Sequence, residues 1–521
     1  MDGSNAVYRW GDPGRAVTLP DGVRALLASV LGVRAPRPPV PVVTPPPSRL
    51  PDAARAALDA VCGRVRTDDA VRVGHAAGMS TVDLLRLRAG DAADAPDAVV
   101  EPADHDEVVA VLRACAANRI AVVVYGGGTS VVGGLRARRE GYAGLVAVDL
   151  RRLDRLVAVD PVSRTATFDA GVRAPRAEEL LAAHGFTLGH FPQSYEYATI
   201  GGFAATRSSG QASAGYGRFD QMVVALRVAT AGGTLHLGRA PHAAAGPDLR
   251  QLFLGSEGAF GVITEVTVQV RPVPPVRRYL GWRLPDFAAA GDAMRILAQD
   301  GPLPAVLRCS DEAETAIGAA AAGGEGPGGC LMITGLEGAA GRVAATESAL
   351  ADRLAELGGQ PLGAGPGRAW SGDRFGAPYL RDALLDAGAL VETVETATFW
   401  SALPATYAAV RDALTAALAD QGTPPLVMCH ISHVYPSGAS LYFTVVAAQS
   451  GDPVAQWTAA KAAAGAAIAA AGATISHHHG IGRDHLPWYG EEIGPWATAA
   501  LRGVKRVLDP EHILNPGILL D

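Results

Sequence analysis

The sequence predicts an α+β protein with two main domains, and three observations support this fold class. A strand, a helix at 106–118 and an apolar strand at 120–125 follow one another from residue 99. Residues 186–275 are rich in Gly, Ser and short apolar runs and end at the stop RPVPP. From 276 to about 470, strands alternate with long helices, which predicts an antiparallel sheet covered by helices.

The same patterns divide the chain into four segments. Residues 1–94 hold a short helix, a proline-rich linker from Ala35 to Ser48 and more helical sequence, since the prolines exclude both helix and central strand from the linker. Residues 95–275 are the first main domain, and residues 276–475 are a cap-like substrate domain. Residues 476–521 carry HHHGIG and a helix before DPEHILNPGIL, and we expect this tail to return to the first domain.

Composition argues against several classes of function. The 521 residues carry a formal net charge of -7, which disfavours binding to a nucleic-acid backbone but allows a local basic pocket. The 5 cysteines lack the paired spacing of a zinc site, which fits a reducing, cytoplasmic setting. No apolar stretch reaches the ~20 residues that a membrane-spanning helix needs.

A run of glycines follows the strand IAVVVY. In GGGTSVVGG, from Gly126 to Gly134, the glycines let backbone N–H groups approach an anion with no side chain in between. The loop fails the dinucleotide fingerprint because Val131 stands where the third glycine belongs, and it lacks the lysine of a P-loop. The loop therefore suits a diphosphate, but it matches neither the nicotinamide-dinucleotide motif nor the ATP-binding motif. These residues alone also fit a turn without a ligand.

Two later segments extend this pattern. They are GHFPQSYEYATIGGFAATRSSG, from Gly189 to Gly210, and GSEGAFGVITEVTVQV, from Gly255 to Val270. Together with the glycine loop they resemble the vanillyl-alcohol-oxidase-type (PCMH-type) flavoproteins, which implies an FAD-binding domain of two subdomains. The residues that this resemblance assigns to FAD are Tyr125, Gly126, Gly127, Gly128, Thr129, Ser130, Pro192, Gln193, Ser194, Tyr195, Glu196, Tyr197, Ala198, Thr206, Arg207, Ser208, Ser209, Glu257, Gly258, Ala259, Phe260, Gly261, Val262 and Ile263.

The resemblance also bears on how FAD is attached. Members of this family that bind flavin covalently usually place a His or Cys beside the ring system. Thr129 stands where some of them carry the attached His. We therefore expect a non-covalent, dissociable FAD.

The strand SLYFTVV in the cap places a tyrosine on a polar face. Side chains alternate along a strand, so Ser440, Tyr442 and Thr444 share one face. A phenol with a pKa of about 10 accepts a proton near neutrality only beside positive charge, which arginine or histidine can supply. Tyr442 is therefore a catalytic candidate, and a tyrosine that merely hydrogen-bonds at a domain interface is the simpler alternative.

Three histidines stand together in the tail. If the segment is extended, His477 and His479 face one way and His478 the other. A histidine triplet could bind a metal ion, but this motif holds no carboxylate to complete a site, so we expect proton transfer and phosphate binding and no metal. A straight strand points His430 and His433 to opposite faces, so a metal site built on both needs a bend in the chain. Metal binding by these two residues stays open.

The chain resembles the alkyldihydroxyacetonephosphate synthase family from YRWGD near its start to DPEHILNPGIL near its end. The most specific portions are VLRCSDEAE with Arg308, PYLRDALLDAGALVETVET with Arg381 and Thr393, SLYFTVV, and ISHHHGIG. By themselves the two arginines would be ordinary surface charges. The resemblance implies that both bind the substrate, since a phosphate needs such donors, and that Thr393 keeps the hydroxyl of an expected serine.

The activity implied by this resemblance involves no net oxidation or reduction. The acyl group of acyl-dihydroxyacetone phosphate is exchanged for a long-chain alcohol, as in ether lipid synthesis, through an adduct on N5 of reduced flavin. Tyr442 would remove and return a proton at the reacting carbon, assisted by the tail histidines. The expected partners are a phosphorylated lipid-like substrate and a long-chain alcohol, with peripheral membrane contact, a homodimer and no nucleic acid.

An FAD-dependent D-2-hydroxyacid dehydrogenase on the same fold is the alternative. Such enzymes typically show HxGDGNxH in the cap and SGEHGIG in the tail, and often use a divalent metal. The corresponding stretches here are HVYPSGASLYF and SHHHGIG. A flavin-binding or lipid-carrier protein without catalysis is a third hypothesis, but it has no need of Tyr442, Arg381 and the histidines together.

Overall fold

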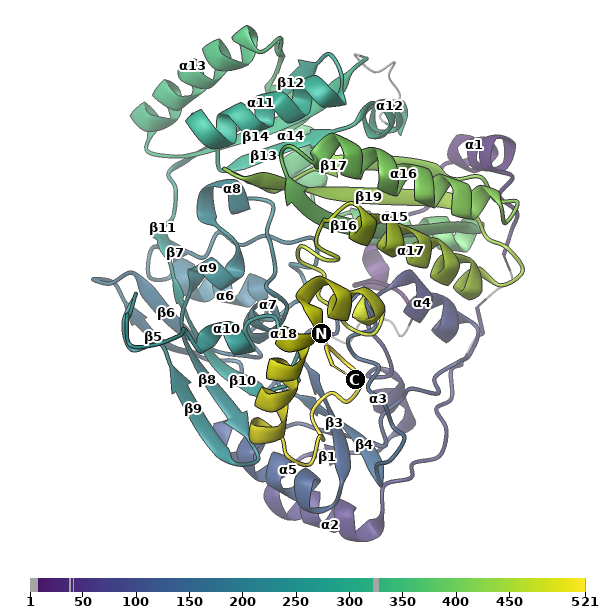
Figure 1. Ribbon diagram of the computed structural model, residues 1–521, viewed down its shortest axis with the longest axis vertical. Coiled ribbons are helices and arrows are strands. Elements are labelled where there is room, and N and C mark those ends of the chain that lie inside the picture. Colours follow the sequence, from purple (N-terminus) through teal and green to yellow (C-terminus); the bar gives the residue numbers. More distant parts are fainter. Residues whose placement is uncertain (1–7, 37–38, 41, 322–327, 521) are drawn as a thin grey trace.

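The computed structural model describes residues 8–36, 39–40, 42–321 and 328–520. Two smaller sheets lie at one end of the molecule, and a large sheet with its helices, the cap, lies at the other (Figure 1). Helices and sheets are mixed as expected, and the α+β class is confirmed.

The first sheet has the strand order β1-β2-β4-β3, in which β2, β4 and β3 are parallel and β1 is antiparallel. Its parallel strands are apolar on both faces, as sequences such as IAVVVY require. The strands are β1 (Val65–Arg66), β2 (Ala98–Val100), β3 (Ile120–Tyr125) and β4 (Gly144–Asp149). The helical elements before and within this part are η1 (Pro13–Arg15), α1 (Asp21–Leu31), α2 (Asp52–Val61), α3 (Asp69–Val73), α4 (Thr81–Arg88) and α5 (His105–Ala117).

The second sheet is antiparallel, in the order β5-β6-β10-β8-β9, and a short pair, β7 and β11, lies beside it. The strands are β5 (Leu156–Asp160), β6 (Thr165–Asp169), β7 (Phe186–Thr187), β8 (Val223–Thr230), β9 (Gly233–Leu237), β10 (Val262–Gln269) and β11 (Arg271–Pro272). The helices are α6 (Ala174–Ala182), α7 (Ile200–Thr206), α8 (Ser213–Tyr216), α9 (Phe219–Met222) and α10 (Arg250–Phe253).

The cap is built on an antiparallel sheet in the order β15-β12-β14-β13-β17-β19-β16, with β18 paired to β19. The strands are β12 (Val276–Leu284), β13 (Val306–Ser310), β14 (Cys330–Gly338), β15 (Gln360–Gly363), β16 (Ala389–Phe399), β17 (Leu426–Ile431), β18 (Val434–Tyr435) and β19 (Gly438–Ala448). The helices are α11 (Phe287–Asp300), α12 (Glu312–Ala321), α13 (Ala340–Glu356), α14 (Ala364–Asp373), α15 (Ala377–Ala387), α16 (Leu403–Ala419) and α17 (Pro453–Ala470).

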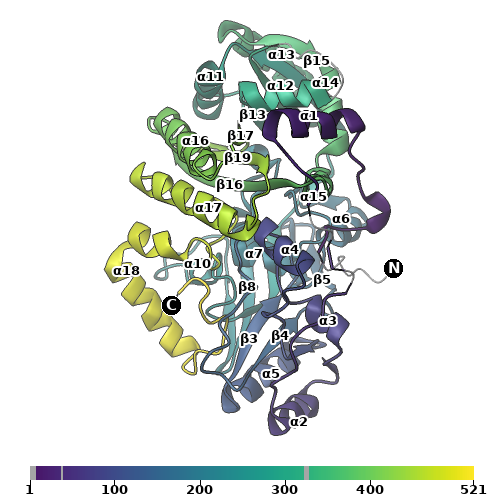
Figure 2. The same ribbon diagram turned by 90° about the vertical axis from the view of Figure 1, so that its right-hand side faces the viewer.

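Helices lie against both faces of the outer cap strands. Figure 2 shows α16 and α17 on one side of β16 and β19, and α1 on the other. On the α16 side, Leu390 and Val394 of β16 join the main cap core. On the α1 side, Leu27 and Leu31 pack against Val391 and its neighbours. The N-terminal helix, which precedes the proline-rich linker, therefore belongs to the cap in space.

The tail lies along the two smaller sheets through α18 (Leu486–Leu508), which is kinked at Gly494, and the residues after it (Figure 1). Lys505 Nζ donates to the carbonyl oxygens of Ala259 and Leu514, at 2.8 and 2.6 Å. The N–H of Val122 in β3 donates to a tail carbonyl at 2.7 Å. These bonds join the end of the chain to the first two sheets.

Within the described ranges, none of the helices combines the length and the apolar sequence needed to cross a bilayer. All five cysteines are buried and free.

Candidate active site

A cavity of about 420 Å³ lies between the cap sheet and the two smaller sheets. Its walls come from the glycine loop after β3, the segments around α7 and before β10, four cap strands, α15 and the tail. Parts of the chain that are far apart in sequence therefore meet around one space.

The glycine loop presents bare backbone to this cavity. Within the described ranges, none of the N–H groups from Gly126 to Ser130 donates to a backbone acceptor. Side chains have no room here, because a Cβ on Gly127 would lie 2.0 Å from the carbonyl oxygen of Tyr197. Consecutive N–H groups of this kind form anion-binding concavities, so the loop fits the diphosphate of FAD.

Most residues that the sequence resemblance assigns to FAD line the cavity. They are Gly126, Gly127, Gly128, Thr129, Ser130, Pro192, Gln193, Ser194, Ala198, Thr206, Ser208, Ser209, Glu257, Gly258, Gly261 and Ile263. The others are not among the lining residues, and they are Tyr125, Tyr195, Glu196, Tyr197, Arg207, Ala259, Phe260 and Val262. Tyr125, for example, packs on His75 with 4.3 Å between ring centroids, and Arg207 donates to the carbonyl of Leu254 at 2.8 Å.

Three neighbouring cap strands place polar side chains in one row. Glu395 of β16 and His430 of β17 are both direct cross-strand partners of Tyr442 on β19, so the three side chains point to the same face. Val394 and Phe443 point the other way, into the cap core. The His430 and Tyr442 rings stack with centroids 4.9 Å apart. Strand alternation predicts the polar face, and the register of the strands determines that Glu395 and His430 lie beside Tyr442.

Tyr442 is a phenol at neutral pH. Burial raises its pKa to about 12, and the opposing effects of Thr393 and Arg308 are too small to offset that. The positive charge that the sequence suggested near Tyr442 therefore does not lower its pKa below the usual value, because the cost of burying a phenolate is larger. The hydroxyl donates to Thr393 Oγ1 at 3.2 Å. It can give a proton directly, and it can accept one only after a base has taken its own.

The two candidate phosphate-binding arginines have different surroundings. Arg381 Nη1 donates to the carbonyl of Met79 at 2.6 Å. Its Nε and Nη2 are buried and have no hydrogen-bond partner within the described ranges, although Nη2 lies 3.6 Å from Asp382. Arg308 instead forms an ion pair with Glu314. Both arginines line the cavity, and of the two it is Arg381 whose buried nitrogens lack a hydrogen-bond partner in the described part of the chain.

His430 belongs to the Arg308 pair. Its Nδ1 lies 2.9 Å from Glu314 Oε2 and 3.1 Å from Arg308 Nη2. Burial raises the pKa of Glu314, but the charges of His430 and Arg308 outweigh that effect and lower the pKa to about 2. Glu314 therefore stays charged and compensates Arg308.

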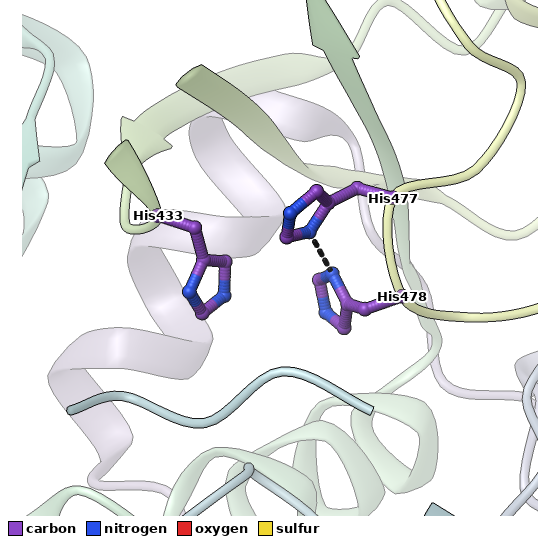
Figure 3. Close-up of side chains that lie close together, drawn as sticks. All are labelled: His433, His477 and His478. Atoms are coloured by element: carbon purple, nitrogen blue, oxygen red, sulfur yellow. Dashed lines mark hydrogen bonds between the residues drawn. The ribbon is translucent and has the colours of Figure 1, made fainter. Parts of the chain in front are cut away.

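The tail histidines lie in a turn, not on an extended strand. The N–H groups of His477, His478 and His479 all donate to the carboxylate of Glu395, at 2.8, 3.1 and 3.0 Å. The ring nitrogens Nδ1 of His477 and His478 lie only 3.0 Å apart (Figure 3). The alternate facing expected for an extended segment is wrong, because one buried carboxylate gathers three consecutive N–H groups.

His433 approaches this turn from the loop after β17. One nitrogen from each of His433, His477 and His478 lies within 4.8 Å of the others (Figure 3), so this trio has the spacing to hold a metal ion. Two of the rings already have hydroxyl partners: Ser209 lies 3.1 Å from His433 Nδ1, and Tyr435 lies 2.6 Å from His477 Nε2. The trio thus forms a hydrogen-bonded network at the cavity wall, which His433 and His478 line.

Burial disfavours protonation of His433, His477 and His479. It lowers the pKa of His479 to about 3 and lowers the pKa values of His433 and His477 well below the usual range. Burial also raises the pKa of Glu395, but the electrostatic interaction and hydrogen bond with His478, and then the electrostatic interaction with His479, outweigh it, so that pKa lies well below its usual value. The site therefore holds a charged carboxylate beside imidazoles whose protonation burial disfavours.

Several wall residues carry no signal that the sequence arguments used. Glu314 and Glu392 line the cavity, and Glu395 lies just behind it. Glu395 alternates with Thr393 along β16, so the strand pattern places both on one face. Nothing local indicates that the tail supplies the partners of Glu395.

Comparison with known proteins agrees with this geometry. Residues 96–238 match the family model of the FAD binding domain, and residues 273–519 match that of the C-terminal domain of FAD linked oxidases. Alkyldihydroxyacetonephosphate synthase of Trypanosoma brucei brucei is 33% identical over 481 residues, which are 88% of this chain and 78% of that protein. The chain belongs to the alkyldihydroxyacetonephosphate synthase family. The Dictyostelium discoideum member is 32% identical over the same shares.

The fold leads to the same family. A solved structure of an alkyldihydroxyacetonephosphate synthase superposes with a TM-score of 0.84 at 28% identity and covers 98% of both chains. This family member is therefore an FAD-dependent enzyme. Its free glycine-loop N–H groups and the cavity before them fit that cofactor.

Proposed function

We propose that the enzyme exchanges the acyl group of an acyl-dihydroxyacetone phosphate for a long-chain alcohol, forming an ether bond without net oxidation or reduction. One observation carries this proposal: a single cavity joins the glycine loop, Arg381, Tyr442 and the tail imidazoles. FAD, when bound and reduced, supplies a nucleophilic ring nitrogen for the exchange. The products are the alkyl compound and a fatty acid, and the alcohol gives up its proton.

The cofactor is held by the glycine loop and the segments before α7 and β10 that line the cavity. The free N–H groups from Gly126 to Ser130 support binding of the diphosphate. Thr129 offers no imidazole or thiol for attachment to the flavin, so we infer that FAD is bound without a covalent link.

The substrate phosphate is assigned to Arg381. Its guanidinium is held by the bond from Nη1 to Met79, and its buried Nε and Nη2 lack a hydrogen-bond partner among the described residues, which a phosphate would supply. Arg308 is compensated by Glu314, so we assign it to orienting the rest of the substrate together with Thr393. Glu314 lines the cavity beside Arg308 and would repel a dianion there, whereas Asp382, 3.6 Å from Arg381 Nη2, is not among the cavity-lining residues, which favours Arg381 as the anchor.

Proton transfer at the reacting carbon is assigned to Tyr442 and the tail imidazoles. Tyr442 holds its proton at neutral pH, which suits it to returning one to the carbon. His478 and His479 lie with ring centroids 6.1 and 5.7 Å from the Tyr442 ring. Both imidazoles line the cavity, and His477, whose Nδ1 lies 3.0 Å from that of His478, extends the hydrogen-bonded network behind them.

The experiment supplies purified, FAD-loaded enzyme with acyl-dihydroxyacetone phosphate and hexadecanol, and measures ether product and released fatty acid by mass spectrometry. A parallel reaction offers D-lactate and a redox dye. Ether product with no dye reduction is expected. Dye reduction by D-lactate without ether product would instead support the D-2-hydroxyacid dehydrogenase alternative.

We further infer that the enzyme meets its lipid-like substrates at a membrane surface and forms a homodimer. Trp496 and Val507 of α18 are 87% and 79% exposed, and the exposed Arg502 and Arg506 lie between them, a combination typical of peripheral helices. Exposed Leu26 and Val30 of α1, at 50% and 66%, provide a separate apolar face for self-association. Sedimentation with anionic vesicles tests the first inference, and light scattering tests the second.

A further inference from the structure

The tail turn, residues 476–482, is suspended between two carboxylates from different parts of the protein. Glu395 of the cap accepts from the N–H groups of residues 477, 478 and 479. Glu257, in the loop before β10, accepts from the N–H of Ile481 at 2.8 Å and of Gly482 at 3.0 Å. The N–H of Gly480 donates to Ser476 Oγ at 3.1 Å. All six N–H groups from 477 to 482 are thus bound.

Both carboxylates are buried, with 1% exposure for Glu395 and 8% for Glu257. A buried carboxylate is strongly disfavoured unless hydrogen bonds compensate it. Glu395 receives three amides and the hydroxyl of Ser476, which donates at 2.7 Å. An apolar side chain of the same size could not accept hydrogen bonds from those amides. The two acidic side chains are therefore specific hydrogen-bond partners of the backbone of this turn.

The turn itself is built to admit these contacts. Gly480 has a φ of +91°, and a Cβ there would lie 2.9 Å from Glu257 Oε1. Gly482 has a φ of +54°, and a Cβ there would lie 2.0 Å from the carbonyl oxygen of Val132. Glycine is therefore needed for the backbone to reach Glu257 while it also packs on the glycine loop at Val132.

The two anchors connect the turn to the two sides of the cavity. Glu395 is the direct cross-strand partner of Tyr442. Glu257 lines the cavity beside Gly258, in the segment assigned to FAD. The imidazoles of His478 and His479, which project from the turn between them, also line the cavity. Their positions relative to Tyr442 therefore depend on both carboxylates.

We propose that Glu395 and Glu257 are positioning residues that hold the tail turn from opposite sides and thereby fix the His478 and His479 imidazoles against Tyr442 and the flavin segment. This inference rests on the proposed function, since it treats those imidazoles as the proton-transfer groups. It assigns no direct contact with the substrate to either carboxylate.

The expected kinetic effect falls on turnover. Glu395→Gln replaces one accepting oxygen by an NH2 group that faces amide donors, so the turn shifts and the imidazoles move. A misplacement of about 1 Å can lower a rate on the order of 10²-fold, and a fall of that size in kcat is expected. The KM for the phosphorylated substrate should change little, because Arg381 belongs to α15 and does not contact the turn.

The experiment compares Glu395→Gln, Glu257→Gln and their combination. Glu337→Gln is the matched control, since Glu337 is a buried cap carboxylate that accepts from Tyr216 and Tyr279 away from the cavity. Glu395→Asp, which keeps the charge, and Ser476→Ala, which removes one donor, serve if a Gln variant does not fold. The readouts are kcat, KM, flavin absorbance and hydrogen exchange of the peptide 476–482.

Faster exchange of that peptide in each Gln variant, a lower kcat with unchanged KM, partial rescue by Glu395→Asp and non-additive effects in the double variant are expected. Unchanged exchange, or an equal loss of kcat in Glu337→Gln, would overturn the inference. The wild type separates the two proposals: if it forms no ether product, the proposed function fails, whereas the exchange measurement still decides whether the carboxylates hold the turn.

Discussion

Replacing Arg381 tests the assignment of the substrate phosphate most directly. The guanidinium uses Nη1 on the Met79 carbonyl and leaves Nε and Nη2 without a hydrogen-bond partner in the described part of the chain. Two charge-assisted hydrogen bonds to a phosphate are therefore available. Each contributes about 1.5–3 kcal/mol, so Arg381→Ala should weaken binding of the phosphorylated substrate by about 3–6 kcal/mol, or at least ~10²-fold.

A lysine at this position separates charge from geometry. Arg381→Lys keeps a cation but loses the planar fork, and we expect an increase in KM between those of the wild type and of the alanine variant. Arg308→Ala should raise KM less, because Glu314 already compensates Arg308. Arg278→Ala is the surface control, since Arg278 pairs with Glu347 and is not among the residues that line the cavity.

The assay measures initial rates of ether formation against acyl-dihydroxyacetone phosphate concentration, with flavin absorbance as the check on folding. A KM within two-fold of the wild-type value for Arg381→Ala, with FAD retained, would refute the assignment. A larger KM effect from Arg308→Ala than from Arg381→Ala would transfer the anchor to Arg308.

Four further results are expected. Tyr442→Phe should retain FAD and lose on the order of 10²-fold or more in kcat, as loss of a proton-transfer group does; near-normal turnover would remove Tyr442 from the chemistry. Acid denaturation should release all flavin into the supernatant, because Thr129 offers no attachment, and flavin that stays with the protein would contradict this. Removing metal with a chelator should leave ether formation unchanged, since His433 and His477 already have hydroxyl partners; lost activity that zinc restores would show a metal requirement. Burial raises the pKa of Glu257 to about 7 from a usual 4.5, so its contribution to stability is complete below pH 4.5 and is lost as the pH rises to about 7. The free energy of unfolding, measured by chemical denaturation, should fall over this pH range in the wild type and fall less in Glu257→Gln. An unchanged pH dependence in the variant would be evidence against the shift.

Local structure was predictable wherever the chain's own periodicity decides it. The strand 120–125 was predicted with the bounds that β3 has, and the helix predicted at 106–118 lies within one residue of α5 (His105–Ala117) at each end. The side chain of Asp104 caps this helix by accepting from the Glu107 N–H at 2.9 Å. Hydrophobic alternation and capping act over a few residues, which is why sequence is sufficient for them.

Long-range packing was less accessible. The helix before the proline-rich linker has no local feature that selects its partner, yet α1 packs on the cap sheet beside Val391. The tail histidines would alternate in direction only in an extended segment, but Glu395 draws their N–H groups into a turn. In both cases the partner lies more than 80 residues away in sequence, and only the folded chain brings it within contact.

The sequence by itself determined the α+β class, the glycine loop suited to a diphosphate and the polar face that carries Tyr442, because each depends on residue type and short-range spacing. Tertiary structure alone decided that Arg308 is compensated by Glu314 while two buried nitrogens of Arg381 lack a partner within the described residues, that Tyr442 remains a phenol, and that the backbone of the histidine turn donates to two buried carboxylates. The charge state and hydrogen bonding of a buried group depend on what surrounds it, and those surroundings are assembled from distant segments.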